Sequence, residues 1–205
     1  MFMNKENSPI CKIESGQKQI KIPVDGQLSK KGTIVKKTST AGEIDYSIAG
    51  LVDNINKAGF KSIYSCSGLK KDHPNREIKP DGGYISFLIQ ENELDAIAWI
   101  KNAAHRFNLT VEHTKISKKP ALVVRIDKDR EGNSLTDRIR IANGSESENC
   151  ETISEHAYGA FTKDLEDIIE RCGGLIYDTD EKIEAVWKKF CSMLLPDTNI
   201  IKNAG

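Results

Sequence analysis

The sequence predicts an α/β fold, a mixed sheet with two main helices, followed by a helical C-terminal segment. Strand-type alternation and short apolar runs recur between residues 18 and 127, and helix-type spacing of apolar residues interrupts them twice. Helix-type spacing prevails after residue 150. Apolar residues make up 38% of the 205-residue chain, which is enough for a packed core.

The individual elements follow from periodicity and from the turn residues between them. Residues 18–24 alternate polar and apolar side chains, and Pro23 indicates an edge strand. Residues 33–38 are expected to return as the second strand of a hairpin. A helix capped by Asp45 has apolar side chains at i, i+3, i+4 and i+7, and Gly59 marks its end. The other expected elements of this part are strands at 61–66, 84–90, 109–115 and 121–127, a helix at 93–107, an exposed polar loop at 70–83 and a turn at 118–120.

These patterns divide the chain into three parts. Residues 1–17 are expected to be a flexible lead-in, and residues 18–127 an α/β ligand-binding domain. Residues 128–205 form a helical segment that packs on the core or serves in assembly. Its expected helices are at 134–142, at 150–172, and a last one that Asp180 caps and Pro196 ends.

Charge and cysteine content restrict the function classes. Lysine plus arginine and aspartate plus glutamate number 30 each, which disfavours a nucleic-acid coat or a membrane-surface protein. No window approaches the roughly 18–20 consecutive apolar residues of a membrane span, and residues 1–19 lack the apolar core of a secretory signal. The five cysteines are widely spaced without a C-x-x-C pair, which favours reduced thiols. We therefore expect a cytoplasmic protein with no membrane partner.

The most informative stretch is the turn Ser65-Cys66-Ser67-Gly68, which ends a predicted strand. Ligands of α/β proteins gather beyond strand ends, and hydroxyls, a thiol and a glycine supply donors, acceptors and a permissive backbone. Basic residues follow within one loop, which suits a phosphate-bearing ligand. The alternative is a purely structural role, in which the small residues form a tight turn, Cys66 is a buried thiol and the basic residues of the loop are solvated. The candidate ligand-binding residues are Ser65, Cys66, Ser67, Gly68, Lys70, Lys71, His73, Tyr84 and Arg125.

Two resemblances are carried by these residues. Y-S-C-S-G at 64–68, after a helix and before a polar loop and G-Y-I-S-F at 83–87, resembles a group of phage-type proteins with the same order of motifs. The S-C-S-G turn followed by a strand, a helix and two strands is similar, more distantly, to the methyltransferases that act late in wybutosine synthesis on phenylalanine tRNA. The resemblance implies a related α/β fold and a site at 65–68. Leu69 stands where the methyltransferase family has arginine, and 106–109 lacks that family's glycine- and arginine-containing turn.

Among the catalytic and metal-binding motifs that the sequence could contain, a nucleophilic cysteine is the alternative that stays open. Asp72 occupies the position where a cysteine phosphatase loop carries arginine. Cys66 can still act as a nucleophile, because a partner such as His73, His105 or His113 needs only to meet it in space. The common phosphate-loop motifs are absent, and no His/Cys/Asp cluster has the sequence spacing of a metal site, so no metal and no resident cofactor are predicted.

We therefore expect a protein that binds a phosphate-bearing nucleotide-type small molecule. The phage-type resemblance suggests a specific version, a viral anti-defence protein that sequesters a host nucleotide immune signal in the host cytoplasm. The enzymatic alternative is an S-adenosylmethionine-dependent RNA methyltransferase-like enzyme with tRNA as partner, or a nucleotide-cleaving enzyme. A third hypothesis is an assembly role, in which the helical segment forms a homo-oligomer.

Overall fold

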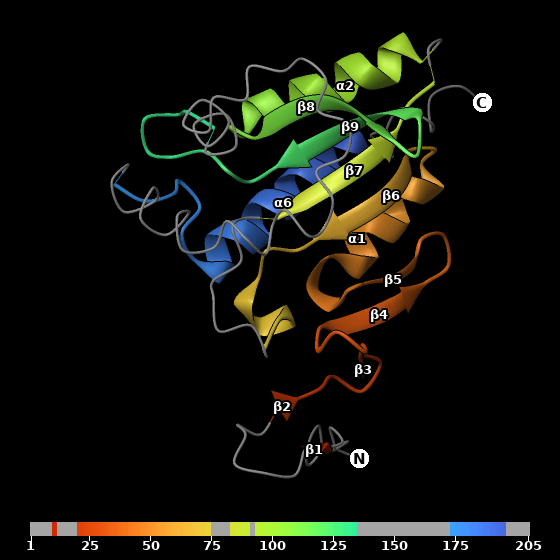
Figure 1. Ribbon diagram of the computed structural model, residues 1–205, viewed down its shortest axis with the longest axis vertical. Coiled ribbons are helices and arrows are strands. Elements are labelled where there is room, and N and C mark those ends of the chain that lie inside the picture. The colour runs from red at the N-terminus through yellow and green to blue at the C-terminus, as the bar shows by residue number, and fades with distance from the viewer. Residues whose placement is uncertain (1–9, 12–19, 75–82, 91–92, 135–172, 196–205) are drawn as a thin grey trace, which may run out of the picture.

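The computed structural model describes residues 10–11, 20–74, 83–90, 93–134 and 173–195 (Figure 1). The expectations for the lead-in and for helices at 134–142 and 150–172 lie outside these residues, apart from positions 10, 11 and 134. No helix in the described part is long and apolar enough to cross a membrane. The α/β class is confirmed.

The main sheet has four antiparallel strands in the order β6-β7-β9-β8. Their bounds are β6 Lys61–Cys66, β7 Tyr84–Leu88, β8 Thr110–Ile116 and β9 Lys119–Arg125. The expectation of a mixed sheet was wrong, because every pair among the described strands is antiparallel. One physical reason is a two-residue hairpin between β8 and β9, where Ser117 and Lys118 both have positive φ (50° and 67°). The turn expected at 118–120 therefore lies earlier, and Pro120 belongs to a strand.

A smaller antiparallel sheet precedes the main one. It consists of β3 (Gln27–Leu28), β4 (Ile34–Thr38) and β5 (Gly42–Asp45), with β4 in the middle. The strand predicted at 33–38 is confirmed, but its partners are β3 and β5. Of the strand expected at 18–24, the described residues 20–24 contain β2 (Ile20–Lys21), which pairs with β1 (Ile10–Cys11). The chain turns directly after β2, where the Gly26 amide donates to the Pro23 carbonyl.

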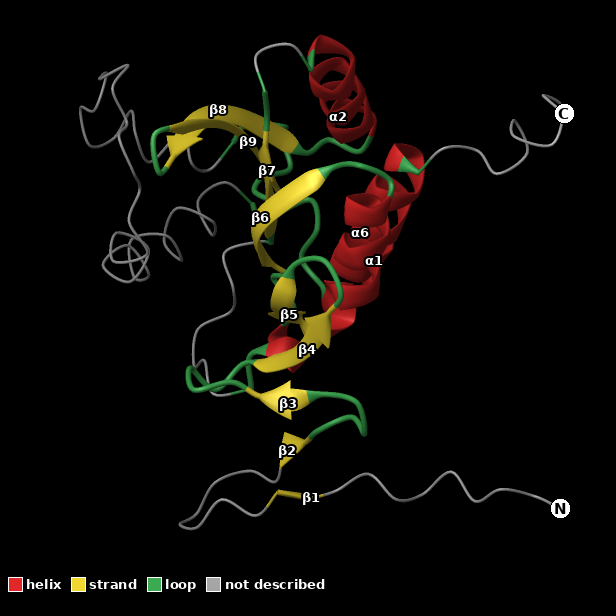
Figure 2. Ribbon diagram, turned by 90° about the vertical axis from the view of Figure 1, so that its right-hand side faces the viewer, coloured by secondary structure: helices red, strands yellow, loops and turns green. Residues whose placement is uncertain are grey.

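Three helices confirm the helical predictions within the described residues. They are α1 (Tyr46–Lys57), α2 (Leu94–Arg106) and α6 (Asp180–Leu194). Figure 2 shows α1 and α6 side by side on one side of the main sheet, and α6 contacts both α1 and α2. Helix α1 ends as expected, with Gly59 at φ 106°.

The core lies between these helices and one face of the main sheet. Its apolar side chains come from alternate positions of the two central strands, Ile85 and Phe87 on β7 and Leu122 and Val124 on β9. The Phe190 ring of α6 packs edge-on against Phe87, with centroids 6.3 Å apart. Helix α6 is therefore part of the core of the α/β domain.

Candidate functional site at the turn after β6

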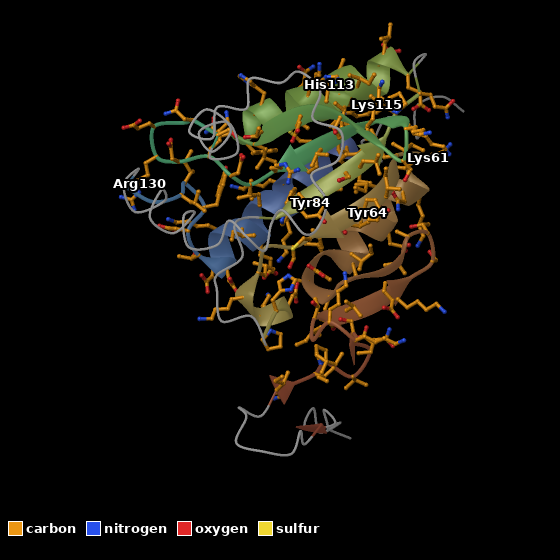
Figure 3. The ribbon with its side chains drawn as sticks, viewed as in Figure 1. Lys61, Tyr64, Tyr84, His113, Lys115 and Arg130 are labelled. Carbon is orange, nitrogen blue, oxygen red and sulfur yellow. The ribbon has the colours of Figure 1, made fainter. Side chains whose placement is uncertain are left out.

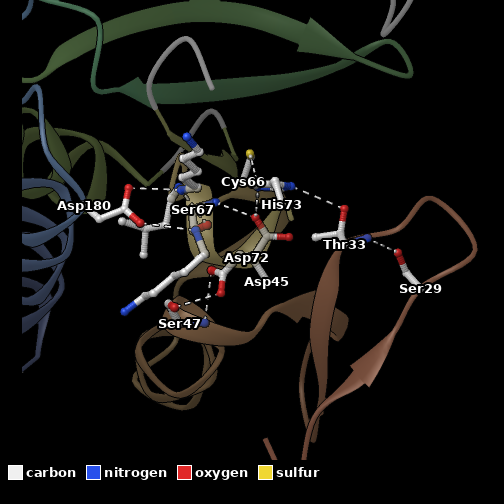
Figure 4. Close-up of polar contacts among 12 residues, drawn as sticks. Ser29, Thr33, Asp45, Ser47, Cys66, Ser67, Asp72, His73 and Asp180 are labelled. Atoms are coloured by element: carbon white, nitrogen blue, oxygen red, sulfur yellow. Dashed lines mark hydrogen bonds and ion pairs between the residues drawn. The ribbon is translucent and has the colours of Figure 1, made fainter. Parts of the chain in front are cut away.

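Three side chains meet at the turn where β6 ends (Figure 4). Asp45 is the last residue of β5, Cys66 is the last residue of β6, and His73 follows the short 3-10 helix η1 (Lys70–Asp72). The His73 Nε2 atom lies 3.1 Å from Asp45 Oδ2 and 3.4 Å from Cys66 Sγ. Asp45 and His73 are buried, and Cys66 is half-buried. A carboxylate, an imidazole and a thiol thus share one small volume.

The Asp45 carboxylate binds the turn and does not cap the helix that follows it. It accepts a hydrogen bond from the Ser67 amide at 2.7 Å, and it makes no side-chain cap of α1. Asp72 takes that role, because its carboxylate accepts hydrogen bonds from the Ser47 amide at 3.2 Å and the Ser47 hydroxyl at 2.8 Å. The exposed loop expected at 70–83 was therefore wrong at Asp72 and His73, which are 2% and 3% exposed.

Burial raises the pKa of the Asp72 carboxyl above its ordinary value of 3.8. Hydrogen bonds from Ser67 and Ser47 act in the opposite direction, and the negative charge of Asp45 raises the pKa of Asp72 further. Two buried carboxylates therefore lie close enough to repel each other.

Three backbone amides of this turn donate to carboxylates of the protein. The amides of Lys70 and Lys71 donate to the two oxygens of Asp180, at 3.0 and 3.2 Å. The sequence assigned Asp180 to the cap of α6, but the cap is Thr179, whose hydroxyl accepts from the Lys182 amide at 3.3 Å. With the Ser67 amide bound to Asp45, three amides that could hold a phosphate already bind the protein's own anions.

Close packing also fixes the turn. A Cβ atom added to Gly83 would lie 2.4 Å from the Ser67 carbonyl oxygen, so only glycine fits there. The same carbonyl accepts a hydrogen bond from Trp187 Nε1 of α6 at 3.0 Å. Gly68 has φ 72°, which glycine adopts without strain. The small residues of the motif thus have a structural role.

Tyr84 and Arg125 lie in one row with Cys66 across three neighbouring strands. The Arg125 guanidinium lies 5.5 Å from the centroid of the Tyr84 ring, and Arg125 Nε is 3.4 Å from Glu112 Oε2. Successive side chains of a strand point to opposite faces, and Ile85, which follows Tyr84, points into the core. The row that contains Tyr84 is therefore on the sheet face away from the helices. Figure 3 labels Tyr84 and the exposed Tyr64 on β6.

The structure separates the other candidate residues from this cluster. Ser65 has a buried hydroxyl oxygen without a hydrogen-bond partner among the described residues. Lys70 and Lys71 are exposed, and Lys71 Nζ pairs with Glu184 at 2.5 Å. Asp45 was missed as a site residue, because its position before a helix indicated a cap and no local pattern points to a partner more than 20 residues away.

A second polar region lies beside α2, at a cleft of about 800 Å³ between α2, β8 and residues 128–134. Its basic lining side chains are Lys101, His105, His113 and Lys128, and no carboxylate is among its described lining residues. The buried carboxylate of Asp127 contacts two residues that line this cleft, because it accepts hydrogen bonds from the hydroxyls of Thr110 and Ser134. Burial, and then the charge of Lys101, lower the pKa of His113.

This cleft contains two histidines that the sequence offered as bases for Cys66. His113 is on β8, which β7 and β9 separate from β6, and His105 is on α2. Of the three histidines considered, His73 is the one that contacts Cys66.

Comparison with known proteins finds no family model, curated protein or solved structure that matches the chain. Functional assignment therefore depends on the geometry of the two polar regions.

Proposed function

We propose that the protein binds a phosphate-bearing nucleotide-type ligand, with the phosphate in the cleft formed by α2, β8 and residues 128–134. The observation that carries this proposal is the lining of that cleft by two lysines and two histidines with no described carboxylate among them. A volume of about 800 Å³ is in the range of small-molecule sites. Phosphate oxygens accept charge-assisted hydrogen bonds from lysine and from protonated histidine.

The cleft suits phosphate better than the turn after β6 does. At the turn, a phosphate would have to displace Asp180 from two backbone amides and would approach Asp45 and Asp72. In the cleft, Asn102 and Asn133 add amide groups that can recognise a base or a sugar beside the cationic groups. We place the nucleotide in this cleft, and we propose that the protein sequesters the nucleotide without changing it chemically.

A nucleotide-cleaving enzyme is the second candidate, and the contact between Cys66 Sγ and His73 Nε2 favours it. A thiol beside an imidazole is the arrangement that activates a cysteine nucleophile. In this case the nucleotide would be converted, whereas sequestration returns it intact.

The test is a mass-spectrometric screen of the purified full chain with cyclic nucleotides, ADP-ribose-type nucleotides and S-adenosylmethionine, measured before and after heat denaturation. A nucleotide that leaves solution and returns with unchanged mass supports sequestration. A nucleotide of changed mass supports the enzyme, and no depletion of any nucleotide contradicts the binding proposal.

Variants then locate the ligand. Each charge-assisted hydrogen bond contributes roughly 1.5–3 kcal/mol, so Lys101→Ala and Lys128→Ala should each weaken binding about tenfold or more. Lys70→Ala is the matched control, because this exposed lysine lies at the turn and not in the cleft. Equal losses in the cleft variants and in Lys70→Ala would contradict the location.

A further inference from the structure

We propose that Asp45, Cys66 and His73 form a binding site for a transition-metal ion of the zinc class. The ligand atoms that they offer all lie within 4.8 Å of one another. The three residues come from three separate segments of the chain, at the ends of β5 and β6 and after η1. This site is independent of the ligand proposed for the cleft.

Two of the three distances within the cluster match those between ligands of one tetrahedral ion. Zinc bonds of about 2.0–2.3 Å to nitrogen, oxygen and sulfur place neighbouring ligand atoms about 3.3–3.6 Å apart. Here His73 Nε2 lies 3.4 Å from Cys66 Sγ and 3.1 Å from Asp45 Oδ2. The two distances from His73 Nε2 therefore fit an ion after shifts of a few tenths of an ångström, and the ligand atoms of Asp45 and Cys66 lie within 4.8 Å of each other.

A second layer of contacts orients the ligands as metal sites require. The other ring nitrogen of His73, Nδ1, lies 3.3 Å from the Thr33 hydroxyl oxygen, which can accept its proton and leave Nε2 for the metal. The Thr33 amide in turn donates to the Ser29 hydroxyl at 3.1 Å. The Ser67 amide holds the Asp45 carboxylate at 2.7 Å. Each of Asp45 and His73 is thus fixed by a neighbour that is not itself a ligand.

Charge favours a cation at this position. Asp45 and Asp72 are both buried carboxyl groups, and negative charges on them repel each other. A divalent ion bound to Asp45 and the Cys66 thiolate would offset that repulsion. Three protein ligands leave a fourth tetrahedral position for water or a ligand atom, as in zinc sites that act on substrates.

The test uses the untagged full chain with zinc alone in equilibrium dialysis, and with Co²⁺ as a spectroscopic substitute. We expect one ion per chain that depends on this cluster, a thiolate-to-cobalt charge-transfer band, and a rise in the melting temperature on addition of zinc. Asp45→Asn and Cys66→Ser keep the size of each side chain, and His73→Gln removes the imidazole. Each should lower the affinity by at least 100-fold, since each removes one of three ligands.

Two further variants separate ligation from a general effect on folding. Thr33→Val keeps all three ligands but loses the contact with Nδ1, so zinc affinity should fall about 10-fold. Cys191→Ala is the thiol control, because Cys191 is buried in the core, and it should keep the cobalt band. A cobalt band that persists in Cys66→Ser, or wild-type zinc affinity in Asp45→Asn and His73→Gln, would overturn the proposal. Failure of the wild-type chain to bind either ion would overturn it as well.

Discussion

The turn after β6 and the cleft beside α2 are both polar, but they differ in how their charges are matched. At the turn, the carboxylates of Asp45 and Asp180 accept hydrogen bonds from three backbone amides, those of residues 67, 70 and 71. In the cleft, basic side chains line an open space in which no described residue supplies a carboxylate. Backbone amides that already bind carboxylates are not available to an anion, whereas basic groups that face no carboxylate of the described residues attract one. This difference is the reason that we propose phosphate for the cleft and a metal ion for the turn.

Replacement of Gly83 by alanine should have the largest effect, because it forces the turn open. The new Cβ atom would lie 2.4 Å from the Ser67 carbonyl oxygen, a contact that only a backbone shift can relieve. We expect a loss of about 3 kcal/mol in the free energy of unfolding, measured by urea denaturation. Gly50→Ala on α1 is the matched control, since nothing lies within 4 Å of its added Cβ, and it should stabilise the protein by about 0.5–1 kcal/mol. Equal stability of Gly83→Ala and wild type would show that the turn is not rigid.

Removal of the Asp180 carboxylate tests whether that group occupies an anion position. Asp180→Ala leaves the amides of Lys70 and Lys71 without their acceptor, at a cost of about 1–2 kcal/mol. Inorganic phosphate should then raise the melting temperature of the variant more than that of wild type, because the two amides become available to it. Asp178→Ala is the control, since Asp178 pairs with Lys182 and Arg130 and not with the turn. An equal phosphate response in all three proteins would mean that Asp180 does not fill an anion site.

Much of the fold could be predicted from the sequence, because helix and strand periods are local. The apolar spacing that follows Asp45 gave α1, and the apolar run from Tyr84 gave β7. Strand pairing is not local, and the reversal between β8 and β9 uses Ser117 and Lys118 in place of the usual glycine or asparagine. The sequence therefore predicted a turn between these strands, slightly too late, but not the pairing of β9 with β7 that leaves the main sheet antiparallel.

The candidate site could be predicted only in part, for a related reason. The motif drew attention to Cys66 and, through its basic loop, to His73, and these two side chains do meet. Asp45 and Asp180 each stand at the start of a helix, where an aspartate is read as a cap. Their carboxylates instead bind backbone amides 22 and 110 residues away, at Ser67 and Lys70. Such contacts depend on tertiary packing, which no local pattern contains.

Replacement of Asp72 by asparagine should change how stability depends on pH. Burial raises the pKa of Asp72 in the folded protein, so the folded state holds this proton more tightly than the unfolded chain does. The stabilising contribution of the protonated group is complete below the ordinary value of 3.8 and is lost as the pH rises through the folded pKa. The stability of wild type relative to Asp72→Asn should therefore fall from pH 3 toward neutrality. Urea denaturation over this range measures the difference, and a constant difference would show that Asp72 is not desolvated.

The smallest effect that we expect concerns His113, and it tests the electrostatics of the cleft directly. Burial is the larger cause of its lowered pKa and the charge of Lys101 is the smaller one. Lys101→Ala should raise the pKa of His113 only part of the way to its ordinary value, because burial remains. A bound phosphate should raise the pKa of His113 in wild type, since an anion stabilises the protonated ring. By linkage, phosphate affinity must then increase as the pH falls through the pKa of His113, and NMR titration of the ring protons follows both changes. If phosphate leaves that titration unchanged while it binds elsewhere on the chain, the basic groups of the cleft are only solvated surface charges.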